Sequence, residues 1–252
     1  MTEIREKDRN MGHYQRFWQW YGLDNPRKWP QWELIEPFVS KKNRVLEIGA
    51  GLRPKIQIDE GYFTDISITA LEKLKKKGAN TVLSDFNEGL PYKDKSFDVV
   101  CAFEVLEHVD KDRIALADIG RVLKLDGQAF ISFPLHEELF NNYDEVVGHK
   151  RRYDTNEIEA LFRECGFKIE QYAAQDVPWP TEKEAGKLVF LSRYLPWVIP
   201  LVTKILDFLP SSAVRQPLNL KRWNADCAKE DFNGVSTGFF VLKKQTDDSS
   251  NL

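Results

Sequence analysis

Cysteine is scarce in this 252-residue sequence, which contains only Cys101, Cys165 and Cys227. Three scattered cysteines are too few for a disulfide framework or a zinc site, and no other group of residues has the spacing of metal ligands. The sequence therefore predicts a protein of the reducing cytoplasm that holds no metal.

A strong charge bias is also absent. The formal net charge is -3, whereas binding to nucleic acid needs a basic surface that neutralises phosphates. We therefore expect no nucleic-acid partner. Residues 1–7 mix charges and contain no apolar run, so we expect no secretory signal.

No long uncharged apolar run is present either. Residues 188–209 come nearest, but prolines and charges interrupt them, and a membrane-spanning helix needs about 20 mostly uncharged residues. Three interpretations stay open: a helical cap with an apolar pocket, a homodimer face, or a segment on a membrane surface. The third would place the protein at the inner membrane face, where it could reach a lipid-linked acceptor.

Aromatic residues are concentrated in an N-terminal arm, residues 1–42. Trp18, Trp20, Tyr21, Trp29 and Trp32 lie there within fifteen positions. They predict an arm that packs onto the main domain, a lid over a ligand, or both. Trp18 is our candidate for contact with the substrate.

From residue 43 the sequence alternates strands and helices, which predicts an α/β fold with a doubly wound, mostly parallel sheet. We expect the main domain over residues 43–175 and 235–244, a helical cap insertion over 176–234, and a disordered tail over 245–252. The expected strands are 44–48, 62–66, 81–84, 97–103, 127–133, 167–173 and 238–243, and the expected helices are 68–77, 114–123 and 157–165.

A glycine turn follows the first expected strand. The stretch Val45-Leu46-Glu47-Ile48-Gly49-Ala50-Gly51 is a short apolar run that ends in a Gly-x-Gly turn, which lets a ligand approach the backbone closely. In α/β folds ligands bind at this carboxyl edge of the sheet. The pattern is weak evidence by itself, because many nucleotide-binding folds use it.

Acidic residues follow the next three strands at the same edge. Asp65, Asp85 and Glu104 suit a ligand that has an adenosine and a cationic amino-acid tail. Asp65 can accept hydrogen bonds from both ribose hydroxyls, and Asp85 from the adenine amino group, with Ile66 or Phe86 against the ring. Glu47 can face an ammonium group while the glycine N–H groups face a carboxylate.

Taken in order, these motifs resemble the class I S-adenosylmethionine-dependent methyltransferases, of the small-molecule type found in quinone biosynthesis and polysaccharide loci. The resemblance covers residues 44–173 and the last strand. It is carried by the glycine turn, Thr64-Asp65-Ile66-Ser67, residues 90–100, Glu104-Val105-Leu106-Glu107-His108-Val109 and residues 121–128.

The resemblance implies a Rossmann-like, seven-stranded sheet with an antiparallel last strand. It also implies S-adenosylmethionine as cofactor and S-adenosylhomocysteine as product. The cofactor-binding residues would be Glu47, Gly49, Ala50, Gly51, Arg53, Asp65, Ile66, Asp85, Phe86 and Glu104. A small-molecule, lipid-linked or glycan-linked acceptor would receive the methyl group, with oxygen favoured as the methylated atom.

The sequence departs from the family at the first helix. Arg53 stands where many relatives have a third glycine, and only thirteen residues separate Gly51 from Asp65. We therefore expect that the first helix is a single turn or absent and that Arg53 reaches the carboxylate of the ligand. These departures disfavour an NAD-dependent oxidoreductase. They keep open a protein that has the fold and binds a ligand without catalysis.

The candidate catalytic residues are His108 and His149, since histidine titrates near neutral pH and can act as a general base. The run Gly148-His149-Lys150-Arg151-Arg152-Tyr153 resembles one in the polysaccharide-locus relatives and implies a wall of the acceptor site. Arg152 and Tyr153 are therefore candidates for substrate binding. The plainer interpretation, that the run is a solvated charged face and His108 a packing residue, stays open.

Overall fold

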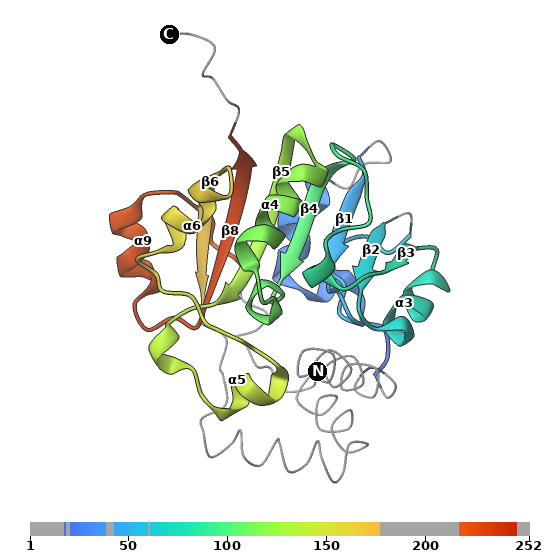
Figure 1. Cartoon of the computed structure of the whole chain (residues 1–252), viewed down its shortest axis with the longest axis horizontal. Coiled ribbons are helices and arrows are strands. Elements are labelled where there is room, and N and C mark those ends of the chain that lie inside the picture. The colour runs from blue at the N-terminus through green and yellow to red at the C-terminus, as the bar shows by residue number, and fades with distance from the viewer. Residues whose placement is uncertain (1–17, 19–20, 39–42, 60, 177–216, 246–252) are drawn as a thin grey trace.

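The computed structural model describes residue 18 and residues 21–38, 43–59, 61–176 and 217–245. These residues form an α/β fold around one eight-stranded sheet (Figure 1). The strands lie in the order β3-β2-β1-β4-β5-β8-β6-β7. Their bounds are β1 Val45–Ile48, β2 Tyr62–Asp65, β3 Asn80–Leu83, β4 Phe97–Phe103, β5 Leu123–Pro134, β6 Phe167–Gln175, β7 Lys221–Arg222 and β8 Thr237–Lys244.

The described residues also form helices. The α-helices are α2 Pro30–Ile35, α3 Ile68–Lys75, α4 Asp112–Val122, α5 Asn142–Val147, α6 Ile158–Glu164 and α9 Ala225–Phe232. The short 3-10 helices are η1 Pro26–Lys28, η2 Glu36–Phe38, η3 Phe86–Glu88, η4 Leu106–His108 and η5 Glu137–Leu139.

The strand directions confirm the expected sheet. The pairs β1·β2, β1·β4, β2·β3 and β4·β5 are parallel, whereas β8 is antiparallel to both β5 and β6. Ile48 at the end of β1 is level with Thr64 of β2 and Ala102 of β4, so the carboxyl ends of these strands meet at one edge. The two-residue β7 is an addition at the far side of the sheet.

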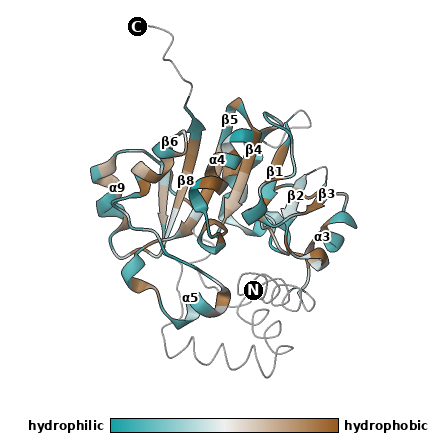
Figure 2. Ribbon diagram, in the orientation of Figure 1, coloured by the Kyte–Doolittle hydropathy of each residue, from teal (hydrophilic) through white to brown (hydrophobic). Residues whose placement is uncertain are grey.

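Helices cover both faces of the sheet, and the core therefore has two parts. Leu116 of α4 lies in the first part, together with residues of α6 and α9, and Leu74 of α3 lies in the second. Because side chains alternate along a strand, β8 places Phe240 in the first part and Phe239 in the second. Figure 2 shows the hydrophobic colour along these central strands. The central strands are buried on both sides, as parallel strands between helices must be.

The connection from β1 to β2 has no helix in its described residues, 49–59 and 61, which confirms the expected loss of the first helix. Gly49 and Gly51 have φ of 68° and 53° there, in the left-handed region that glycine adopts without strain. The chain thus leaves β1 through a tight turn and returns along β2.

Several elements differ from the expectation. Strand β5 begins at Leu123 instead of residue 127, because Leu123 pairs with Phe97 before a register shift. The helices α2 and α5 were not predicted, whereas α9 lies within the expected helical cap. Helices α5 and α9 each begin after an asparagine whose side chain accepts a backbone N–H, Asn141 and Asn224.

Some expected features lie outside the described residues. They include residues 177–216 of the expected cap, with the apolar stretch 188–209, most of the aromatic arm, and residues 246–252 of the tail. The described part of the cap segment forms β7 and α9, which packs on β6 through Phe232 and Tyr172. Among the described residues, no helix is long and apolar enough to cross a membrane.

Candidate functional site

A pocket of about 230 Å³ opens where β1, β2 and β4 end. Its walls come from the loops that follow these strands and β3, and from the aromatic arm. The lining residues are Trp18, Ile48, Gly49, Thr64, Asp65, Ile66, Ser84, Asp85, Phe86, Asn87, Leu90, Glu104, Val105, His108 and Val109. Six of the ten residues predicted to bind the cofactor are among them: Gly49, Asp65, Ile66, Asp85, Phe86 and Glu104.

Asp65 ends β2 and joins two loops at the pocket. One carboxylate oxygen accepts the N–H of Gly51 at 2.8 Å, and the other accepts the N–H of Ser67 at 2.7 Å. Burial raises the pKa of this carboxyl, and the backbone hydrogen bonds oppose the shift. Each oxygen can still accept from a further donor, such as a hydroxyl of a ligand.

Asp85 directly precedes helix η3, and Asn87 of that helix fixes its side chain. Its side chain accepts the backbone N–H of Asn87 at 2.9 Å and the Asn87 amide at 3.1 Å. Ile66 and Phe86 add apolar surface to the lining of the same pocket. Asn87, Val105 and Val109 also line it and were not predicted, because no chemical pattern marks an apolar or amide residue as a wall of a site.

Trp18 from the arm covers the second glycine of the turn. A Cβ built on Gly51 would lie 2.2 Å from the indole ring, so only glycine leaves room for this contact. A Cβ on Gly49 would lie 2.7 Å from the Val105 side chain. The Lys73 ammonium group donates to the Trp18 carbonyl at 2.9 Å and thereby ties the arm to α3.

Glu47 binds the loop that follows the glycine turn. Its carboxylate accepts the backbone N–H groups of Lys55, at 2.9 Å, and Ile56, at 3.2 Å. Burial is the largest influence on its pKa, which rises to about 7. The side chain does not line the pocket, so its predicted contact with an ammonium group stays a prediction.

Three further residues predicted to bind the cofactor lie beside the pocket wall instead of in it: Ala50, Gly51 and Arg53. The Arg53 guanidinium group lies 5.3 Å from the Tyr21 ring centroid and 5.9 Å from that of Trp29. These cation–π contacts hold it against the arm. Its predicted contact with the carboxylate of a ligand is likewise untested.

Glu104 follows β4 with a φ of 53°, an uncommon conformation for a residue with a side chain. Its Oε1 accepts from the Ser132 hydroxyl at 2.7 Å, while its Oε2 is buried without a hydrogen-bond partner among the described residues. Burial raises the pKa of this carboxyl. A buried acceptor at a pocket wall is suited to a donor group of a ligand.

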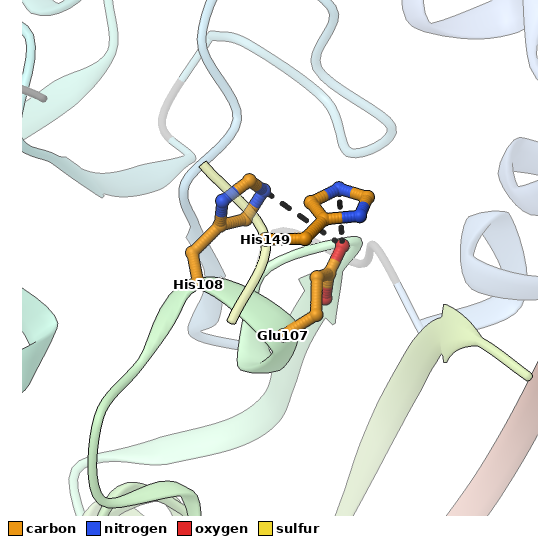
Figure 3. Close-up of side chains that lie close together, drawn as sticks. All are labelled: Glu107, His108 and His149. Carbon is orange, nitrogen blue, oxygen red and sulfur yellow. Dashed lines mark ion pairs between the residues drawn. The ribbon is translucent and has the colours of Figure 1, made fainter. Parts of the chain in front are cut away.

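The two predicted catalytic histidines lie together with Glu107 (Figure 3). The rings of His108 and His149 are 4.7 Å apart at their centroids. The His108 Nδ1 is 3.0 Å from the Gly148 carbonyl oxygen. Burial and the neighbouring His149 lower the pKa of His108 to about 3, so its imidazole is neutral at pH 7. A group with this pKa is a weak general base, and the catalytic role of either histidine stays a prediction.

His149, Arg152 and Tyr153 have partners within the fold. His149 Nδ1 and the Arg152 guanidinium group both bind the buried Asp144 carboxylate, at 2.7 Å and 2.8 Å. Although burial acts in the opposite direction, these hydrogen bonds lower the pKa of Asp144 to about 2. The Tyr153 hydroxyl donates to Asp112 at 3.2 Å. Contact of Arg152 and Tyr153 with a substrate therefore stays a prediction.

Sequence reasoning missed Asp144, which orients His149. The available signal was its place three residues after Asn141: the two form a capping box at the start of α5. A capping box indicates a helix start, and nothing in the local sequence relates it to the motif that contains His108.

These residues fit an adenosyl cofactor. The pocket combines carboxylate acceptors at Asp65 and Asp85, which would suit a ribose and an adenine, with apolar walls at Ile66 and Phe86. The buried Oε2 of Glu104 offers an acceptor to a cationic or hydroxylated group. S-adenosylmethionine would be held by these residues, and it supplies a methyl group that its sulfonium makes reactive.

The comparisons with known proteins agree with this geometry. Residues 47–131 match a family model described as a methyltransferase domain. The chain is 32% identical over 119 residues to an uncharacterized protein of Methanocaldococcus jannaschii, over 44% of this chain and 52% of that protein. It spans about half the length of the curated relatives that it matches.

Solved structures show the same fold. The YcgJ protein from Bacillus subtilis superposes with a TM-score of 0.57 at 17% identity, over 86% of this chain and 99% of that one. The phosphoethanolamine N-methyltransferase 2 of Haemonchus contortus, solved with S-adenosylhomocysteine, gives 0.55 at 18% identity, over 94% of this chain and 58% of that one. At these identities the likeness shows the fold alone. The matched residues 47–131 resemble a methyltransferase domain, and they contain the glycine turn and, apart from Trp18, every residue that lines the pocket.

Proposed function

We propose that the chain transfers the methyl group of S-adenosylmethionine to an oxygen atom of a small-molecule acceptor. The observation that carries this proposal is the pocket at the sheet edge, whose lining includes Asp65, Asp85, Glu104 and His108. Cofactor-binding acids and a neutral imidazole thus face the same cavity.

Asp65 fixes the cofactor side of the pocket. Its carboxylate is already oriented by the N–H groups of Gly51 and Ser67, so little freedom is lost when it accepts the ribose hydroxyls. Asp85, oriented by Asn87, accepts from the adenine amino group. Alignment of donor and acceptor in this manner can contribute about 7–11 kcal/mol to lowering a reaction barrier.

His108 supports oxygen as the methylated atom. Its imidazole is neutral at pH 7 and lines the same pocket as Glu104. A neutral imidazole and a carboxylate both accept hydrogen bonds, and an acceptor molecule with hydroxyl groups supplies the matching donors. The net charge of -3 supports a small acceptor over nucleic acid.

The test is production of S-adenosylhomocysteine, measured by mass spectrometry, when the full chain is incubated with S-adenosylmethionine and a panel of hydroxylated and amine acceptors. We expect turnover with a hydroxylated acceptor, a loss of at least tenfold in Asp65→Asn, and no change in Asp126→Asn. Asp126 is an exposed residue near the start of β5, away from the carboxyl edge of the sheet, and serves as the matched control. Methylation of amines alone would contradict the oxygen assignment.

A second function, ligand binding without catalysis, is favoured by one observation. Trp18 lies against Gly51, on the turn that the family uses for the methionine end of the cofactor. Binding of S-adenosylmethionine without product from any acceptor, in both the wild type and Trp18→Ala, would support this alternative.

A further inference from the structure

Three side chains that can bind a metal ion lie close together at the pocket: those of Glu107, His108 and His149 (Figure 3). The Glu107 Oε1 lies 3.8 Å from the His108 Nε2 and 3.7 Å from the His149 Nε2, and all three ligand atoms lie within 4.8 Å of one another. In a tetrahedral site with bonds of about 2.1 Å, neighbouring ligand atoms are roughly 3.4 Å apart. Small side-chain movements would therefore close these three groups around an ion.

The opposite nitrogen of each imidazole is fixed by the protein. The His108 Nδ1 is 3.0 Å from the Gly148 carbonyl oxygen, and the His149 Nδ1 is 2.7 Å from the Asp144 carboxylate. A carbonyl and an ionised carboxylate only accept, so in a neutral imidazole the proton is assigned to Nδ1 and the lone pair to Nε2. Metal-binding histidines in proteins have this same outer contact, to a backbone carbonyl or a carboxylate. Arg152 in turn holds Asp144.

The burial of the Glu107 carboxylate supports an ion site independently of these distances. Its side chain is fully buried, at 0% exposure, and neither carboxylate oxygen has a hydrogen-bond partner among the described residues. A buried carboxylate without hydrogen bonds is costly unless a cation or a proton compensates it. The Oε1 is directed at the two imidazoles, so an ion among the three groups would satisfy this carboxylate.

We propose that Glu107, His108 and His149 bind one divalent transition-metal ion of the Zn²⁺ type. Two imidazoles with one carboxylate favour such an ion over Mg²⁺ or Ca²⁺, which prefer oxygen ligands. Three protein ligands leave a coordination position for water or for an oxygen of the acceptor. The ion would lower the pKa of that oxygen ligand. The use of this effect in methyl transfer rests on the proposed methyltransferase function, whereas binding of the ion does not.

The site departs from the expectation of no metal drawn from sequence spacing. His149 follows His108 by 41 residues, and only the fold brings η4 and the end of α5 together. Spacing rules detect ligands that share one turn or helix, and this set comes from two separate connections.

The experiment is calorimetric titration of the full chain, without a histidine tag and after EDTA treatment, with ZnCl₂ and separately with MgCl₂. We expect one Zn²⁺ per chain and weaker or no binding of Mg²⁺. The near-isosteric Glu107→Gln and the variant His149→Gln are each expected to lose at least 100-fold in Zn²⁺ affinity. His136→Gln is the matched control, because it removes an imidazole that lies 3.2 Å from the exposed Glu138 carboxylate, and it is expected to keep the wild-type affinity.

The site is overturned if the wild type does not bind stoichiometric Zn²⁺. It is also overturned if Glu107→Gln and His149→Gln bind Zn²⁺ as tightly as the control His136→Gln. Circular dichroism and thermal unfolding monitor the fold. Glu107→Gln decides the question where His149→Gln fails to fold, since Glu107 makes no side-chain hydrogen bond among the described residues. A parallel titration with S-adenosylmethionine separates the two proposals: a chain that binds the cofactor but no Zn²⁺ refutes the ion site and leaves the methyltransferase function standing.

Discussion

At the scale of single residues, the Asp65 carboxylate has two roles. It lines the pocket, and it holds the N–H groups of Gly51 and Ser67. The sequence predicted the first role from its place after the second strand. The second was not predictable, because the closeness of Gly51 depends on how tightly the chain turns between β1 and β2.

The substitution Asp65→Asn tests the structural role. An amide has one acceptor oxygen, so one of the two backbone N–H groups loses its partner. We expect the free energy of unfolding to fall by about 1–3 kcal/mol, the cost of leaving a buried donor unsatisfied. Denaturant unfolding measures it, with the exposed Asp126→Asn as control. An unchanged stability in Asp65→Asn would show that these hydrogen bonds do not hold the turn.

The pKa of Glu47 makes a pH-dependent prediction. Burial raises it from 4.5 to about 7 in the folded protein. Between these two pH values the unfolded chain releases the proton while the folded chain keeps it, so stability falls as the pH rises. At about 1.4 kcal/mol per pKa unit, the wild type should lose about 3 kcal/mol over this range relative to Glu47→Gln.

The measurement is the free energy of unfolding of wild type and Glu47→Gln at pH 4.5, 6 and 8. Contributions of all other groups cancel in the difference between the two proteins. A difference that stays constant with pH would contradict the assigned burial of the Glu47 charge.

At the scale of elements, a turn replaces a helix after β1, and the arm packs on it. The short distance from Gly51 to Asp65 was enough to predict a first helix of a single turn or none, since thirteen residues are too few for a full helix and its loop. The contact between Trp18 and Gly51 could not be predicted, because an aromatic-rich arm specifies a large apolar area but not the surface that it covers.

The substitution Gly51→Ala tests this packing. The added methyl group would meet the Trp18 ring and would also force a side chain into a positive φ, which costs about 1–2 kcal/mol by itself. Gly166→Ala is the matched control, because Gly166 has a φ of 79° but no atom within 4 Å of an added Cβ. We expect Gly51→Ala to destabilise the chain by about 1–3 kcal/mol more than the control, the cost of overpacking.

Chemical denaturation with tryptophan fluorescence would measure both variants. The double variant Trp18→Ala/Gly51→Ala should lack this additional cost when compared with Trp18→Ala alone. Equal losses in Gly51→Ala and Gly166→Ala would mean that Trp18 does not pack on the turn.

At the scale of the whole molecule, the sheet and the pocket at its carboxyl edge were predictable, whereas the histidine cluster was not. Strand β4 could be identified from its β-branched and aromatic residues, and Asp65 and Asp85 from their places after successive strands. The meeting of His108 with His149 depends on α5, a six-residue helix that carries too little periodicity to detect. The chain thus specifies its sheet locally and its polar cluster only through the complete fold.

The central claim is that this edge of the sheet binds an adenosyl cofactor. Calorimetric titration of the full chain with S-adenosylmethionine, S-adenosylhomocysteine and NAD tests it most directly. Saturable one-to-one binding of the two adenosyl ligands, without binding of NAD, is the predicted result. Binding of none of the three, or of NAD alone, would contradict the claim and leave a protein that has the fold without its cofactor site.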